Sequence, residues 1–444
     1  MAGEQFKNCL NTKEMKFLKS KNENSKWAWL TMLLIGIISL GVISCSEDED
    51  NNLTPDGSVE AESGYLQVYQ VRTPSGVVMY ANIGESFPDK IDLSNSIELG
   101  SNIGVVASGD NFFVINTNAQ TISKWEIDKS TFEANVTGVL SYASLGLTGF
   151  LPIAFIDDSK AVLAGFFDGV IAEFNPETME ITETRQIQPL MPGSSNGVSA
   201  SITSNGIGLE NGKVMYSFQH VVEGNCCDFP FDEPTPFMAI YDPSSGSVEY
   251  ISDERLPIGG FFSTSDANGN RYMSPNHYLE VNRHYFGLDD RYAKYYTIRV
   301  DPNGNIDPTF EYELSSAITI DYGGQVSSVL GNEILVNHQD IDTWPNAYSD
   351  RWNWWGNPDF SNNTVIDMAT NEARPFTAFD NYSLGGFYLT TIDGDNYFTA
   401  TTLPEGADVS NQRGDLLRQV SFDEFVLVTE GAPSFNVQYI ARLW

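Results

Sequence analysis

Cysteine and basic residues are scarce in this chain of 444 residues. It has four cysteines, and 24 lysine and arginine residues stand against 59 aspartate and glutamate residues, a formal net charge of −35. Four cysteines are too few for a disulfide framework, so a hydrophobic core must hold the protein together. Such an acidic surface repels nucleic acids, which argues against a nucleic-acid-binding role.

Long apolar runs are also rare, and the main one extends from Trp27 to Ile43 behind a leader that contains six basic residues. A basic leader, an apolar segment and a small-residue cleavage site are typical of a secretory signal. The sequence Val42-Ile43-Ser44-Cys45 resembles a bacterial lipoprotein cleavage box. The resemblance implies removal of residues 1–44 and lipidation of Cys45. The alternative is an uncleaved membrane anchor, because these 17 apolar residues just reach spanning length.

The segment after Cys45 begins with an acidic run, Ser46-Glu47-Asp48-Glu49-Asp50. Residues 45–63 are mostly acidic and polar, with Asn, Pro and Gly, so they predict a flexible tether. Once residues 1–44 are removed, 18 basic and 56 acidic residues remain. The acidic run resembles the export tag of some Gram-negative surface lipoproteins, although a solvated linker has the same composition. These features predict a protein anchored by lipid in the outer membrane and facing the cell exterior.

Sustained helical periodicity is lacking from Gly64 onward, where short apolar or alternating runs are broken by Gly, Asn, Asp and Pro. This pattern predicts an all-β fold. Six turns, at 110, 158, 212, 269, 331 and 394, are spaced 48 to 63 residues apart, and each is followed by two strands. Such a repeat is typical of β-propeller blades. The predicted strand pairs are 112–116 with 122–128, 161–166 with 170–175, 214–218 with 237–242, 272–274 with 295–301, 334–336 with 364–367, and 397–400 with 416–421.

The two ends of the body supply a further blade. Strands are predicted at 66–71 and 77–83, and 436–443 can add a strand to their sheet, which would hide the open edges of the ring. We therefore predict a single seven-bladed β-propeller over residues 64–444. Eight blades, two tandem sandwiches and a β-solenoid are the alternatives.

Four long connections between the second and third strands of a blade are predicted to lie on one face of the ring, at 219–236, 276–294, 337–363 and 402–414. Loops on a rigid ring form a typical binding face, although neutral loop growth produces the same lengths. The second and third connections are rich in aromatic and arginine residues, which dominate binding surfaces. Four of the eight tryptophans lie between 344 and 355. Packing of the insertions against one another is the alternative role of these aromatics.

Three histidines occupy matching places, His220, His277 and His338, which lie 8, 8 and 7 residues after a turn glycine. Imidazoles on one rim of the ring can contact an anionic ligand or a metal. A structural role shared by equivalent positions of the blades explains the matching places of the histidines equally well. We predict no metal site. The residues predicted to contact a ligand are His220, His277, Arg283, His284, Tyr285, Arg291, His338, Trp344, Arg351, Trp352, Trp354 and Trp355.

Motifs of catalysis are absent: the sequence has no Gly-x-Ser-x-Gly elbow, no His-Glu-x-x-His helix and no phosphate or calcium loop with supporting context. Asp393-Gly394-Asp395 is interpreted as a hairpin turn rather than a calcium ligand. The adjacent Cys226 and Cys227 predict a vicinal disulfide or two thiols, with no basic neighbour to activate them. We therefore expect a protein that is not an enzyme and needs no cofactor.

A cleavage box, an acidic tag and an aromatic-rimmed seven-bladed ring resemble the siderophore-binding surface lipoproteins that partner TonB-dependent outer-membrane receptors. The resemblance covers the layout of the whole chain without a diagnostic motif. It implies capture of a ferric siderophore, or a related aromatic nutrient that carries metal, and its delivery to the receptor. The alternatives are a glycan-binding lipoprotein of a polysaccharide-uptake system, a propeller hydrolase or lyase, and a protein-interaction scaffold.

Overall fold

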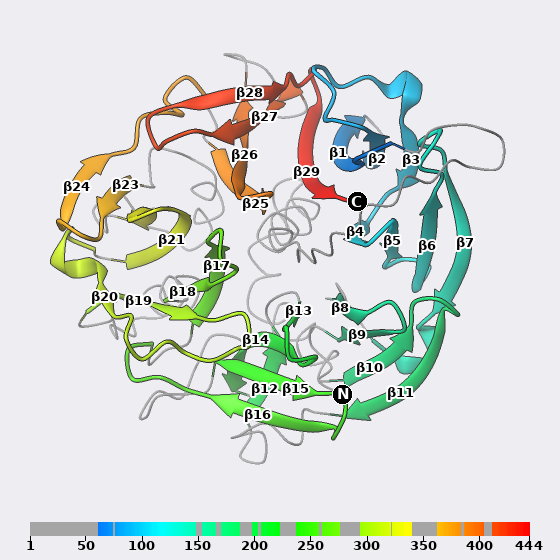
Figure 1. The fold of residues 1–444 in the computed structure, drawn as a ribbon, viewed down its shortest axis with the longest axis horizontal. Helices are drawn as coiled ribbons and strands as arrows, with labels where there is room; N and C mark the ends of the chain where they lie inside the picture. Colours follow the sequence, from blue (N-terminus) through cyan, green and yellow to red (C-terminus); the bar gives the residue numbers. More distant parts are fainter. Residues whose placement is uncertain are drawn as a thin grey trace, which may run out of the picture.

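The computed structural model forms a closed ring of seven β-sheets, each a blade of a β-propeller (Figure 1). It describes residues 61–73, 76–147, 153–165, 170–186, 198–202, 206–222, 237–256, 260–275, 294–320, 322–339, 362–382, 386–403 and 411–444. The seven-bladed prediction is confirmed. The leader and Cys45 lie outside the described residues, so the signal peptide and lipidation stay predictions.

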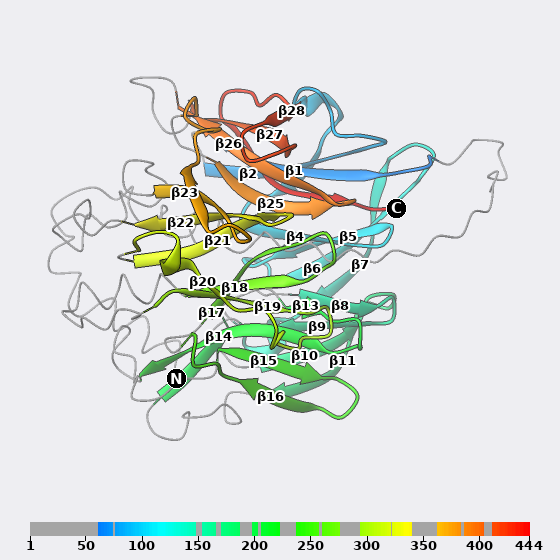
Figure 2. The same cartoon turned by 60° about the vertical axis from the view of Figure 1, so that its left-hand side comes forward.

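The strands of each blade are antiparallel and run from the centre of the ring outward (Figures 1 and 2). Blade 1 contains β29 (Phe435–Arg442), β1 (Tyr65–Thr73), β2 (Gly76–Gly84) and β3 (Ile97–Gly100). Blade 2 contains β4 (Ile103–Ser108), β5 (Asn111–Asn116), β6 (Thr121–Ile127) and β7 (Ala134–Ser141). Blade 3 contains β8 (Ile153–Asp157), β9 (Lys160–Ala164), β10 (Val170–Asn175) and β11 (Glu180–Gln186).

The remaining four blades follow in chain order. Blade 4 contains β12 (Val198–Ile202) and β13 (Ile207–Gly208), which both pair with β14 (Val214–Val222), then β15 (Met238–Asp242) and β16 (Ser247–Ile251). Blade 5 contains β17 (Gly260–Ser265), β18 (Arg271–Pro275), β19 (Tyr296–Val300) and β20 (Tyr312–Glu313). Blade 6 contains β21 (Tyr322–Leu330), β22 (Glu333–Gln339), β23 (Asn362–Asp367) and β24 (Glu372–Pro375). Blade 7 contains β25 (Gly386–Ile392), β26 (Asp395–Thr402), β27 (Arg413–Gln419) and β28 (Phe425–Thr429).

Helices contribute little to the described chain. They are three short 3₁₀ turns, η3 (Leu93–Asn95), η4 (Ala143–Leu145) and η7 (Leu314–Ser316). Within the part of the chain that the structure describes, no helix has the length and apolar character needed to cross a bilayer.

The chain ends close the ring, as predicted. β29 is the innermost strand of blade 1 and pairs antiparallel with β1 from Tyr65 opposite Arg442 to Val71 opposite Phe435, with a bulge after Val68. In Figure 1 the red C-terminal strand lies beside the blue N-terminal strands. This pairing covers the inner edge of β1 and completes blade 1, so the two ends of the chain hold the ring closed.

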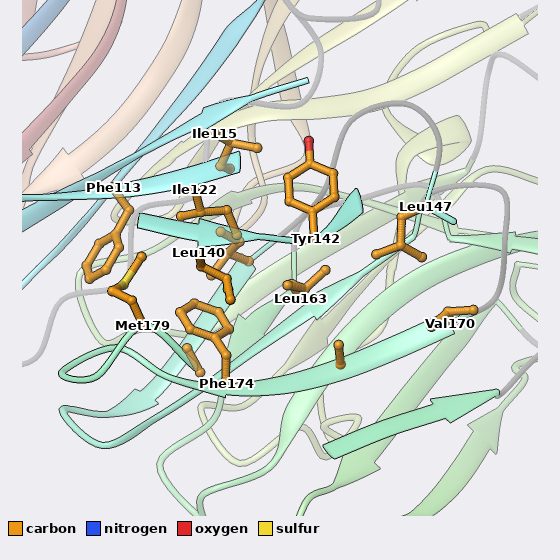
Figure 3. Packing of buried hydrophobic residues seen from close by; sticks show 13 residues of the cluster. Phe113, Ile115, Ile122, Leu140, Tyr142, Leu147, Leu163, Val170, Phe174 and Met179 are labelled. Atoms are coloured by element: carbon orange, nitrogen blue, oxygen red, sulfur yellow. The ribbon is translucent and has the colours of Figure 1, made fainter. Parts of the chain in front are cut away.

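The core of the described ring consists of seven apolar clusters, one for each contact between neighbouring blades. The cluster between blades 2 and 3 contains Phe113, Tyr142, Leu163 and Phe174 among its 13 buried residues (Figure 3). Alternate residues of a strand point to opposite faces of its sheet, so each middle strand serves two clusters. In β22, Ile334 and Val336 face blade 5, while Leu335 faces blade 7.

The connections between the third and fourth strands of each blade, and between the first and second strands of blades 2 to 7, lie on one face of the ring, which we call the turn face. Most of them are short turns, but longer segments join β2 to β3 and β19 to β20. Aspartate side chains hold many of the short turns: Asp242 Oδ1 accepts hydrogen bonds from Ser244 N at 2.9 Å and from its hydroxyl at 2.6 Å. Asp393-Gly394-Asp395 is such a hairpin turn between β25 and β26, with φ of 53° at Asp393 and 83° at Gly394. The hairpin prediction is confirmed, and two positive φ angles are typical of a type I′ turn.

Candidate functional site

The second and third strands of each blade are joined on the opposite face, which we call the insertion face. In blades 2 and 3 these joins are short, because β5 ends at Asn116 and β6 begins at Thr121, while β9 ends at Ala164 and β10 begins at Val170. In blades 4 to 7 the strand ends are much farther apart in sequence: β14 to β15, β18 to β19, β22 to β23, and β26 to β27. The four insertions therefore all start and end on the same face, as predicted.

Most residues predicted to contact a ligand belong to these insertions and lie outside the described residues. They are His277, Arg283, His284, Tyr285, Arg291, Trp344, Arg351, Trp352, Trp354 and Trp355, together with Cys226 and Cys227. The structure does describe the strand ends from which they start. It therefore fixes which face they share and leaves their contacts as predictions.

Two of the matching histidines lie on strands that the structure describes. His220 in β14 pairs through its backbone with Ala200 of the inner strand β12. His338 in β22 pairs with Gly323 of the inner strand β21. Both residues therefore lie on the second strand of a blade, close to the point where the chain leaves for the insertion. His220 and His338 therefore match in the position of their backbones within the blade, and the match concerns the backbone alone.

His338 is packed into the rim, with 9% of its surface exposed. Its Nε2 lies 3.0 Å from the Thr364 hydroxyl, and either atom can donate the hydrogen bond. It follows Ile334 and Val336 at alternate positions of β22, so its side chain points toward blade 5. This geometry favours a structural role for His338.

The inner strand beside His338 has an irregular backbone. Gly324 has φ of 77°, and the register between β21 and β22 shifts between Gly323 and Gln325. A Cβ atom at position 324 would lie 3.0 Å from the ring of Tyr295 in blade 5 and 3.3 Å from Ile320. Glycine is therefore required here both for the positive φ and for the close approach of blade 5.

The cations at the described base of the insertions have carboxylate partners. Lys294, which follows the second insertion, lies 2.7 Å from Glu313 Oε2. The hydrogen bond to Glu313 raises the pKa of Lys294, and the same bond lowers the pKa of Glu313. Lys294 is therefore not a free cation for an anionic ligand. The free cations of this face would have to come from the insertions themselves, where the sequence has Arg283, Arg291 and Arg351.

Residues after the fourth insertion form an ion pair between a partly exposed arginine and a buried aspartate, which the sequence analysis did not find. Arg413 Nε donates to Asp415 Oδ1 at 3.0 Å, and the Gly431 N–H donates to the same oxygen at 2.8 Å. Asp415 is buried, while Arg413 also contacts Glu430 at 3.3 Å. The only signal in the sequence was an Arg and an Asp two residues apart, which place both side chains on one face of a strand. The pair fixes the base of the fourth insertion.

Metal-binding geometry does not occur in the described part of the ring. Within those residues, no three His, Cys, Asp or Glu side chains come together as a metal would require. The described base of the insertion face therefore offers hydrogen-bonding and apolar surface with paired charges.

No family model matches this chain. No curated protein matches it either. Among solved structures, a candidate 6-phosphogluconolactonase from Bacteroides fragilis is 11% identical, with a TM-score of 0.46 over 86% of this chain and 98% of the other. AztD from Citrobacter koseri is 12% identical, with a TM-score of 0.39 over the same shares. A streptogramin B lyase is 11% identical, with a TM-score of 0.39 over 77% of this chain and 96% of the lyase. The propeller assignment rests on the sheet topology, and these likenesses transfer neither ligand nor activity.

Proposed function

We propose that this chain is a cell-surface lipoprotein that binds a ferric siderophore, or a related aromatic nutrient that carries metal, on its insertion face. One observation carries the proposal: four consecutive blades send their long insertions from the same face of a closed, rigid ring. Loops that converge on one face of a rigid scaffold are the usual way in which a ring-shaped protein builds a binding site.

The composition of the insertions supports this choice of ligand. The third insertion has Trp344, Trp352, Trp354 and Trp355 within twelve residues. Indole rings stack on the flat faces of catecholate or other aromatic groups. Because Lys294 is paired with Glu313, the arginines of the insertions are the residues that would meet an anionic ferric complex.

The anchoring part of the proposal rests on the sequence before the ring. Cleavage before Cys45 and lipidation of its thiol would hold residues 45–63 as a tether in the outer membrane, with the ring outside the cell. A TonB-dependent receptor in the same membrane is the proposed acceptor of the ligand. Loss of membrane association in a Cys45→Ala variant tests this part separately.

A fluorescence titration tests the binding part. Tryptophan emission of the protein is expected to be quenched in a saturable way by ferric catecholate siderophore and much less by the iron-free form. The triple variant Trp352→Ala, Trp354→Ala, Trp355→Ala is expected to lose binding. Trp125→Phe, in strand β6 of blade 2, is the matched control and is expected to retain ligand binding. Unchanged affinity in the triple variant would remove this site from the proposal.

Charge reversal separates the siderophore from the glycan alternative. Arg283→Glu with Arg351→Glu is expected to weaken an anionic ferric ligand by tenfold or more, equal to about 1.4 kcal/mol. A neutral oligosaccharide stacked on the same tryptophans would be nearly unaffected. Quenching by oligosaccharides that persists in this variant, with no response to siderophore, would assign the protein to polysaccharide uptake.

A further inference from the structure

The outer edge of blade 2 is unusual for so acidic a protein. Its outermost strand β7 has eight residues and no charged side chain, and it exposes 48% of Val136 and 57% of Val139. Exposed edge strands normally carry charged residues, which discourage further pairing. The outer strands β3, β11, β16, β20 and β24 each contain at least one glutamate.

β28 is the other described outer strand without a charge, and the chain itself covers part of its edge. The Glu430 N–H just after β28 donates to Asp89 O at 2.7 Å, and the Ile91 N–H donates to Glu430 O at 3.3 Å. These contacts belong to residues 85–96, which run between blades 7 and 1 and pack Phe87 against Tyr65 and Tyr397. β7 has no such cover among the described residues.

The sheet register shows which way the two valines point. Val136 lies opposite Trp125 and Val139 opposite Ser123, with a bulge between them. Gly138 lies opposite Lys124 and faces blade 3, since a Cβ there would come within 2.5 Å of Met179. Trp125 belongs to the cluster between blades 1 and 2. Val136 and Val139 therefore lie on the side of β7 that faces blade 1.

The N-terminal segment reaches the ring at the foot of this strand. The Ala61 N–H donates to Lys129 O at 3.3 Å, and Trp444 Nε1 donates to Ala61 O at 3.1 Å. Trp444 in turn stacks on Phe132, with ring centroids 6.1 Å apart. Lys129 and Phe132 belong to the turn that leads into β7. Ala61 thus lies beside the turn that enters β7 and next to Trp444, which packs between blades 1 and 2.

We propose that residues 51–60 of this chain bind along β7 and cover Val136 and Val139. Ten extended residues span roughly 33 Å, which exceeds the roughly 27 Å of an eight-residue strand. The acidic run ends at Asp50, and the following residues include Leu53 and Val59. Covalent attachment at Ala61 gives this segment a local concentration in the millimolar range, which a second copy of the protein does not reach.

Docking of residues 51–60 would shorten the distance between the ring and the membrane, provided that Cys45 is lipidated as proposed. An undocked tether comprises the 16 residues 45–60 and reaches roughly 55 Å, whereas a docked one leaves six residues and roughly 20 Å. Docking would therefore hold the ring close to the membrane, with blade 2 toward it. The docking itself does not require the lipid, so a Cys45→Ser variant is expected to retain it.

Hydrogen exchange of the full-length protein in detergent micelles tests the docking. Amides of residues 51–60 are expected to exchange at least tenfold more slowly than in an unstructured chain. The double variant Val136→Asp, Val139→Asp is expected to restore fast exchange there. Leu427→Asp, at an exposed position of β28, is the matched control and leaves the protection in place. Unchanged exchange in β5 shows that the double variant has folded.

Two outcomes would overturn this proposal. The first is fast amide exchange: if residues 51–60 of the wild-type protein exchange as fast as an unstructured chain, the segment does not dock. The second is protection of the amides of 134–141 that rises with protein concentration while 51–60 stay unprotected. That result would show that a second copy covers β7 instead. Either result leaves the siderophore titration untouched, so failure of the docking and failure of the proposed function are distinguishable.

Discussion

At the residue scale, Gly324 and Glu313 show how the base of the insertion face is built. Gly324 lets β21 bend beside His338 while blade 5 approaches closely through Tyr295. Glu313 gathers Lys294, the Tyr296 hydroxyl and the Ser315 hydroxyl around one carboxylate. Gly324 lies beside the strand from which the third insertion starts, and Glu313 holds the segment where the second insertion ends.

We expect Gly324→Ala to lower the free energy of unfolding by about 1–3 kcal/mol, because φ is 77° and the new Cβ meets the Tyr295 ring. Gly331→Ala is the matched control, since Gly331 has φ of 60° but open space around it. Urea unfolding of both variants separates the two causes. Equal losses would show that the contact with Tyr295 has no cost of its own.

We expect the ion pair of Glu313 to stabilise the protein only above mildly acidic pH. Its pKa lies below the ordinary value of 4.5, chiefly because of the hydrogen bond from Lys294, so the ionised form is favoured in the folded state. That stability is present above pH 4.5 and is lost as pH falls through the lowered pKa. Glu313→Gln should therefore destabilise at pH 7 by at most about 1 kcal/mol, since Lys294 is exposed and Glu313 is partly exposed, and solvent screens their attraction.

Thermal unfolding at a series of pH values checks this expectation. The difference in melting temperature between wild type and Glu313→Gln should become smaller as the pH falls from 5 to 3. Glu372 is an exposed residue of β24, and Glu372→Gln should lower the melting temperature less at pH 7. A difference in melting temperature that grows on acidification would contradict the assigned cause of the pKa shift of Glu313.

At the element scale, the closing strand β29 connects three blades. It pairs with β1, its Val437 and Ile440 pack against blade 7, and its Tyr439 packs toward blade 2. Tyr439 also reaches the inner strand of blade 2, where the Ala107 N–H donates to its hydroxyl at 2.9 Å. Burial raises the pKa of Tyr439 to about 12, so the hydroxyl stays neutral under physiological conditions.

We expect Tyr439→Ala to cost about 3–5 kcal/mol, because it removes a buried ring between two blades. Tyr439→Phe keeps the ring and leaves only the Ala107 N–H without its acceptor, so its cost should be roughly 1–2 kcal/mol. Chemical unfolding of both variants measures the difference. Equal costs would show that the ring itself contributes nothing to the contact.

At the scale of the whole molecule, closure is what turns seven sheets into one cooperative unit. Each cluster joins one blade to the next, and β29 lets the series return to its start. Removal of that strand would expose the edge of β1, with its unpaired backbone groups, to solvent and to other chains.

We expect a variant that ends at Ser434 to form concentration-dependent oligomers and to lose its single unfolding transition. Light scattering after size-exclusion chromatography measures the first effect, and calorimetry measures the second. Arg442→Ala is the control, because it keeps β29 in place and removes only surface contacts of that strand, the exposed ion pair with Asp393 and the hydrogen bond to the Trp444 carbonyl among them. A truncated protein that stays monomeric and unfolds like wild type would show that the closure is dispensable.

Local patterns determined most of the blade assignment. The second and third strands of blades 2 to 7 were predictable because they are short apolar runs bounded by Asp, Asn and Gly turns, as in 170–175. Their lengths were less predictable: β14 extends to Val222 and β9 ends at Ala164. Inner and outer strands were harder to recognise, because β12, β17 and β24 have weak patterns and gain their stability from neighbours.

The sequence by itself determined the fold class, the repeat, the closing role of the last strand and the shared face of the insertions, because alternation and turn residues act over short distances. Only the tertiary structure decided which groups meet across blades. The pairing of Lys294 with Glu313, the packing of His338 against Thr364 and the arrival of Ala61 beside β7 join residues that are 19, 26 and 68 positions apart. Sheet register and blade order set such contacts, and neither is encoded in a local pattern.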